Sequence, residues 1–170
     1  MSIKQFNGEW VAQEDRILFR FNTTEGQEFR LWLTRHIVSN LLTGCQTLGV
    51  QALEKTHPHE VAQAMQEFQH QSVAQQLNFN ATYEPQTELP LGEAPALVTG
   101  LRITWQSPQV AVDFETNAGQ MVHLHLNEAL MHTMVSLLDK LQTHAQWQLQ
   151  AGATPAAPVA TGGPASPLMH

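Results

Sequence analysis

The chain of 170 residues contains a single cysteine, Cys45, so it cannot form an internal disulfide. Proteins of oxidising compartments often depend on disulfides, and a reducing cytoplasm is therefore the simplest location for this chain. The sequence also lacks any apolar run of about 18 residues or more, and residues 1–10 have no apolar core of signal-peptide length. We therefore expect a cytoplasmic protein without a membrane-spanning segment or other membrane association.

Positive charge is scarce as well. Lys and Arg number 8 against 15 Asp and Glu, which gives a formal net charge of −7. Proteins that bind nucleic acid or anionic lipid over their whole surface neutralise phosphate with many basic side chains. The net charge therefore disfavours such a protein, although it is compatible with a local basic patch.

The common catalytic motifs are also missing. The chain has no G-x-S-x-G, no phosphate-binding Gly-rich loop, no dinucleotide fingerprint and no C-x-x-C. Cys45 falls on the apolar stripe of a predicted helix, with no neighbouring base that would activate its thiol. These absences favour a non-enzymatic protein that needs no cofactor.

What the sequence does contain is one pattern that occurs twice. Residues 17–42 and residues 110–135 align without a gap, 93 positions apart. The identical pairs in this alignment are Phe21 and Phe114, Thr23 and Thr116, Gly26 and Gly119, Gln27 and Gln120, Leu31 and Leu124, and Leu33 and Leu126. Internal similarity of this kind indicates a repeated structural unit.

Each copy changes its period in the middle. Two segments of alternating apolar and polar residues flank a Gly-containing turn, which predicts a β-hairpin. The period then becomes helical, and Thr34 and Asn127 stand where an N-cap is expected. Further strands are predicted over 3–11 and 97–105, ahead of the two hairpins. The repeated unit is therefore predicted to be β-β-β-α.

The predicted fold class is α+β, in which a duplicated β-β-β-α unit gives a mainly antiparallel sheet with helices packed on one face, plus a connecting helix. We predict a first repeat over 1–55, the connecting helix over 56–80, a Pro- and Glu-rich linker over 81–96, a second repeat over 97–150 and a disordered tail over 151–170. The side chains expected to face the helices are Phe19, Phe21, Phe29, Leu31, Val112, Phe114, Leu124 and Leu126. The stripe expected on the connecting helix consists of Val61, Ala64, Met65 and Phe68.

His123 and His125 are the best candidates for metal ligands. Residues i and i+2 of a strand share one face, which places the two imidazoles about 7 Å apart. A third ligand is lacking, because His132 is predicted to point away from the sheet, and Arg30 and Trp32 occupy the equivalent positions of the first copy. We therefore expect exposed or interface histidines here and predict no bound metal.

The outward face of the sheet is the most informative surface. Its expected members are Arg16, Leu18, Arg20, Arg30 and Trp32 from the first copy, and Ala111, Asp113, Met121, His123 and His125 from the second. Arg, Trp and Met are enriched in protein interfaces. Arg beside aromatic side chains can also bind single-stranded nucleic acid, and a solvated face with weak ion pairs would need no partner at all.

We favour a protein-interaction or scaffold module that acts through this outward face, either as a homo-oligomer or with another protein. One alternative is a module for single-stranded nucleic acid that uses Arg16, Arg20, Arg30 and Trp32, which the net charge disfavours. Another alternative is a metal-binding protein that uses His123 and His125.

Overall fold

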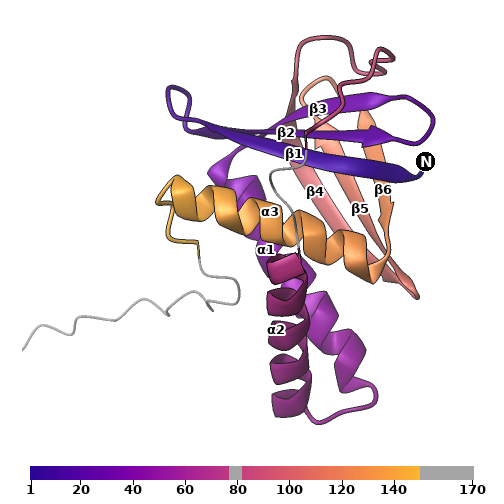
Figure 1. Cartoon of the computed structure of the whole chain (residues 1–170), viewed down its shortest axis with the longest axis vertical. Coiled ribbons are helices and arrows are strands. Elements are labelled where there is room, and N and C mark those ends of the chain that lie inside the picture. Colours follow the sequence, from indigo (N-terminus) through magenta and orange to yellow (C-terminus); the bar gives the residue numbers. More distant parts are fainter. Residues whose placement is uncertain (77–81, 150–170) are drawn as a thin grey trace, which may run out of the picture.

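The computed structural model describes residues 1–76 and 82–149, so the predicted disordered tail over 151–170 lies outside the described residues. Within them the chain is α+β, with a mixed sheet and helices (Figure 1). The elements in chain order are β1 (Ile3–Val11), β2 (Arg16–Thr23), β3 (Glu28–Leu33), α1 (Arg35–Glu54), α2 (His59–Gln76), β4 (Ala96–Gln106), β5 (Gln109–Thr116), β6 (Met121–Leu126) and α3 (Glu128–His144).

The six described strands form one sheet in the order β1-β2-β3-β4-β5-β6. Neighbouring strands are antiparallel within each half, as expected, but β3 and β4 are parallel where the halves meet. The expectation of a mainly antiparallel sheet therefore missed the parallel joint at its centre. The chain leaves β3, passes through α1 and α2, and returns in the same direction beside it, which is the long crossover that parallel pairing requires.

The two halves of the sheet share their local construction. Thr23 donates its backbone N–H to the carbonyl of Gln27 across the first hairpin turn, at 2.9 Å, and Thr116 donates to Gln120 across the second, also at 2.9 Å. Both turns contain a glycine with positive φ, at Gly26 and Gly119. In each half the register also shifts once near the start of the first strand.

Equivalent positions of β1 and β4 are not separated by the same number of residues as equivalent positions of the two hairpins. Ile3 pairs with Thr23, whereas Val98 pairs with Thr116, so the first strands are offset by 95 positions and the second strands by 93. The loop over 12–15 is two residues longer than the loop over 107–108, which accounts for the difference. An ungapped alignment of the two copies therefore cannot include their first strands.

Helices α1 and α3 each pack on the first strand of the other half. Helix α1 lies against β4 and helix α3 lies against β1, and both cover the same side of the sheet in Figure 1. The halves are interleaved as a result. The predicted repeats over 1–55 and 97–150 therefore share a single core.

The core lies between the helices and the inner side of the sheet. All eight side chains expected on that side are buried, and all of them except Phe29 are fully so. The N-caps are formed as expected, because Thr34 Oγ1 accepts from the amide of Ile37 and Asn127 Oδ1 accepts from the amide of Leu130. Period and capping thus predict the packing of each half.

The stripe predicted for α2 is wrong. Val61 is 44% exposed and Phe68 is 72% exposed, whereas Ala62 is fully buried. Helix α2 packs against α1 and α3, away from the sheet (Figure 1). A Cβ on Gly49 of α1 would collide with the amide of Gln66, so the helices meet at a glycine and a polar side chain. No helix of the described residues is long and apolar enough to cross a membrane.

Candidate functional site

One end of the outward face of the first half is covered by the chain itself. Residues 82–95, between α2 and β4, cross β1, β2 and β3 near the Gly26 turn, where they bond to Gln5, Asn22 and Glu28. The backbone N–H of Glu28 donates to the carbonyl of Glu88 at 2.8 Å, and the side-chain amide of Asn22 donates to the carbonyl of Glu84, also at 2.8 Å. Lys4 forms an ion pair with the Glu84 carboxylate at 2.5 Å. We name residues 82–95 the strap.

The arginines predicted for this face all have partners within the chain. Arg16 bonds to Glu14 and its guanidinium lies 4.5 Å from the centre of the Trp32 ring. Half-exposed Leu18 lies opposite Trp32 in the β2–β3 register. These contacts use the cation and the aromatic ring that a bound nucleotide would need.

The strap holds the other two arginines. Arg20 donates to the side-chain oxygen of Asn7 at 2.6 Å and lies 5.1 Å from the centre of the Tyr83 ring. Arg30 donates to the Glu28 carboxylate at 2.7 Å and to the carbonyl of Glu93 at 3.1 Å. Arg20 and Arg30 are therefore engaged by the chain's own extended segment.

Glu28 of β3 anchors the strap to the sheet. Its side chain is fully buried, and its second carboxylate oxygen accepts the backbone N–H of Gln86 at 2.9 Å. Burial by itself would raise the pKa of Glu28, but the hydrogen bonds from Arg30 and Gln86 lower the pKa overall. A buried, ionised carboxylate thus fixes both the Arg30 side chain and the path of the strap.

The outward face of the second half is open. Met121 is 48% exposed, and the histidines at 123 and 125 are exposed beside it on β6. His123 Nδ1 lies 2.8 Å from Oδ1 of Asp113 on β5. Ala111, which was expected on this face, is buried. The second half thus presents a short strand with alternating exposed side chains.

No group of three potential metal ligands is found among the described residues. His123 and His125 lie together on β6, as the strand period predicts, with Asp113 as the acidic neighbour of the first. His132 lies elsewhere, buried between α3 and α2, with its ring centre 6.1 Å from that of His70. The structure therefore does not assemble the predicted histidines with a further ligand.

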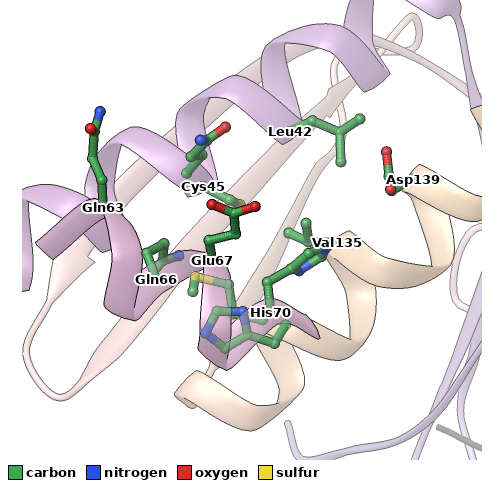
Figure 2. A pocket seen from close by; sticks show the side chains of 11 residues that line it. Leu42, Cys45, Gln63, Gln66, Glu67, His70, Val135 and Asp139 are labelled. Carbon is green, nitrogen blue, oxygen red and sulfur yellow. The ribbon is translucent and has the colours of Figure 1, made fainter. Parts of the chain in front are cut away.

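A cavity that the sequence did not reveal lies between the three helices (Figure 2). It has a volume of about 420 Å³, and its apolar lining comes from Leu42 and Cys45 of α1 and from Met131 and Val135 of α3. Burial raises the pKa of the Cys45 thiol to about 12, which removes it as a nucleophile at neutral pH. The one feature of the sequence that could have indicated this cavity is the polar content of α2. A helix with so many Gln and His residues needs partners for its buried polar groups.

Comparisons of the chain with protein-family models, curated proteins and solved structures find no match. The function must therefore be inferred from the geometry of these surfaces.

Proposed function

We propose that the protein is a non-enzymatic interaction module that self-associates by antiparallel pairing of β6 with β6 of a second copy. The observation that carries this proposal is the unpaired backbone edge of β6. The backbone N–H and C=O groups of β6 that point away from β5 have no hydrogen-bond partner among the described residues. A free edge of this kind is a template for a further strand.

The residues on this edge follow from the β5–β6 register. Thr116 donates its backbone N–H to Gln120, so these two residues form a hydrogen-bonded pair. Hydrogen-bonded and non-hydrogen-bonded pairs alternate along an antiparallel ladder, so the backbone groups of Val122, Leu124 and Leu126 point toward β5. The intervening residues Met121, His123 and His125 therefore direct their backbone groups away from the sheet. The same three residues carry the exposed side chains of the outward face.

Strand β6 also lacks the features that protect natural edge strands. It carries no Lys, Pro, Asp or Glu and shows no bulge. The other edge strand, β1, carries Lys4 and Glu9 and a register shift between Ile3 and Gln5. Charges and bulges discourage strand addition, so β6 is the edge that favours it.

A two-fold axis at His123 gives a complete pairing. His123 then exchanges both backbone hydrogen bonds with His123 of the second copy. Met121 of each copy pairs with His125 of the other. All three free residues on each edge gain partners, and each six-stranded sheet continues into the other. The strand is thus self-complementary, which favours a second copy over an unrelated peptide.

The first half shows that this scaffold accepts an added strand at the equivalent place. On β3, Glu28 bonds to Glu88 of the strap, and Trp32 lies beside Leu97 of β4 in the parallel pair. Met121 and His125 are their counterparts in the second half, in the 93-residue spacing of the hairpins. One of the two equivalent edges is completed by the chain, and the other is open.

His123→Pro tests this pairing. The amide of His123 faces the free edge, so proline is expected to be tolerated in the fold while it removes two hydrogen bonds from the dimer. At about 1 kcal/mol per bond, the dimer dissociation constant is expected to rise at least ~30-fold in sedimentation equilibrium. His123→Val is the matched control, because it removes the imidazole but keeps the N–H, and it is expected to leave the dimer nearly unchanged. A wild-type monomer at submillimolar concentration, or equal effects of the two variants, would contradict the proposal.

We further propose that the two halves arose by duplication of one β-β-β-α unit. The shared turn bonds, glycines, N-caps, register shift and helix crossings support this origin.

A protein-binding role has more support than the nucleic-acid alternative, because Arg16, Arg20 and Arg30 already have partners within the chain. The cytoplasmic location remains a prediction from the single cysteine.

A further inference from the structure

The cavity between α1, α2 and α3 has an unusual distribution of polar groups. The α2 side of the cavity is lined by Gln63, Gln66, Glu67 and His70, while the exposed side of α2 carries Val61 and Phe68. A helix that only completes a core buries its apolar residues and exposes its polar ones. Helix α2 departs from this pattern, because Gln66 and His70 are half-buried while Val61 and Phe68 are exposed, so its inner side suits a polar guest.

The charge of the lining is one-sided. Glu67 of α2 and Asp139 of α3 contribute carboxylates, and the described residues that line the cavity include no Lys or Arg. Figure 2 shows Glu67 and His70 extending from α2 into the space between α1 and α3. Asp139 Oδ1 accepts a hydrogen bond from Gln142 at 2.9 Å, which holds this carboxylate in place. A cavity with this lining attracts a cation.

His132 is the independent sign of an absent guest. It is 2% exposed, it lines the cavity, and its Nε2 has no hydrogen-bond partner among the described residues. Its nearest charged neighbour, Glu128, is 3.9 Å away, which is too far for a hydrogen bond. Gln46 of α1, also in the lining, has an unpartnered buried Oε1. Buried polar atoms without partners are rare in folded proteins and call for an explanation.

The protonation state of His132 adds to the chemistry. Burial lowers the pKa of His132, and the neighbouring Glu128 opposes this only in part. At neutral pH the ring is therefore neutral and can accept a hydrogen bond from a cationic donor. A protonated amine has three N–H donors, which suit this nitrogen, the Gln46 oxygen and the Glu67 carboxylate, while an alkyl chain would contact the apolar side of the cavity.

We propose that this cavity is a binding site for a small aliphatic amine in its protonated form. The ammonium group lies between Glu67 and His132, the alkyl part contacts Leu42 and Val135, and Asp139 adds to the negative charge of the lining. A volume of about 420 Å³ is within the range of small-molecule sites. The site lies in the helical layer and needs no β6 pairing, so it is independent of the proposed self-association.

Titration calorimetry with n-hexylammonium chloride tests the site. We expect saturable binding with a dissociation constant of about 1 mM or tighter, and at least ~10-fold weaker binding of the neutral isostere 1-hexanol. Ring signals of His132 in heteronuclear NMR spectra are expected to shift on addition of the amine. Glu67→Gln is expected to weaken binding about 5-fold, since a partly exposed ion pair contributes up to about 1 kcal/mol.

Glu60→Gln is the matched control, because Glu60 is an exposed carboxylate of the same helix that does not line the cavity. It is expected to change the affinity less than 2-fold, by analogy with other isolated surface charges. Absence of saturable binding would overturn the proposal. So would hexanoate binding as tightly as hexylammonium, or equal losses in the two glutamine variants.

Discussion

Replacing Gly44 with leucine is expected to lower the free energy of unfolding by about 3 kcal/mol. Gly44 lies where α1 crosses β4, and a Cβ there would be 2.6 Å from Cδ1 of Ile103. A leucine at this position would therefore force the helix away from the strand, despite its better helix propensity. Thr43→Leu is the matched control, because Thr43 is exposed on the same helix, and it is expected to change stability by less than about 0.5 kcal/mol.

The crossing of α3 over β1 has the same geometry as that of α1 over β4, but there the large residue is on the helix and the glycine is on the strand. Leu137 is the tenth residue after the N-cap of α3, as Gly44 is after the N-cap of α1, and Gly8 corresponds to Ile103 in the strand register. A Cβ on Gly8 would be 3.6 Å from Cδ2 of Leu137 and 2.5 Å from Cδ1 of Leu141. Glycine is on the helix at one crossing and on the strand at the other.

This exchange predicts a strong coupling between Gly44 and Ile103. Ile103→Gly alone is expected to cost about 3–5 kcal/mol, because it leaves a void and places glycine in a strand. Gly44→Leu combined with Ile103→Gly recreates the pairing of Leu137 with Gly8, and should be at least ~2 kcal/mol more stable than the sum of the single effects predicts. Urea unfolding of the four proteins measures this coupling. A coupling near zero would mean that the two crossings are not equivalent.

Glu28→Ala is expected to lower the free energy of unfolding by about 3 kcal/mol, the low end for a broken buried ion pair because Arg30 is 27% exposed. The substitution leaves the Arg30 guanidinium without its carboxylate and the Gln86 amide without its acceptor. We therefore expect the strap to become susceptible to proteolysis. Glu88→Ala is the matched control, since the Glu88 side chain is exposed and its bond to Gln27 lies at the surface, and it should cost less than about 1 kcal/mol. Equal effects of the two substitutions would contradict an anchoring role for Glu28.

The same carboxylate makes stability sensitive to acid. Because the pKa of Glu28 is lowered on folding, its contribution is present above its ordinary pKa of about 4.5 and is lost as the pH falls below that value. Wild-type protein should therefore lose more stability than Glu28→Ala between pH 6 and about pH 3.

The sequence predicted the parts of this fold that depend on local period. The alternation around Gly26 and Gly119 identified both hairpins, and Thr34 and Asn127 are the N-caps of α1 and α3. The parallel contact of β3 with β4 could not be predicted in this way, because it depends on the path of a long crossover. The stripe on α2 was wrong for a related reason, since its partners are two helices and a cavity rather than the sheet.

The candidate surface was predicted only in part. Strand parity identified which side chains of β2, β3 and β6 face outward, including Arg20, Arg30 and His123. It could not show that the strap covers one end of the first half, because a contact such as that of Asn22 with Glu84 spans 62 positions of the chain. Long-range coverage, rather than local pattern, therefore removes one end of the first half from the candidate interface.

Amide hydrogen exchange at β6 tests the proposed self-association most directly. In the proposed dimer the N–H groups of His123 and His125 would be bonded to the second copy, while that of Leu124 is bonded to β5 in either state. We predict that His123 and His125 exchange slowly at high protein concentration and rapidly on dilution, with Leu124 slow throughout. Exchange of His123 and His125 that is equally rapid at every concentration would contradict the pairing of β6 with a second copy.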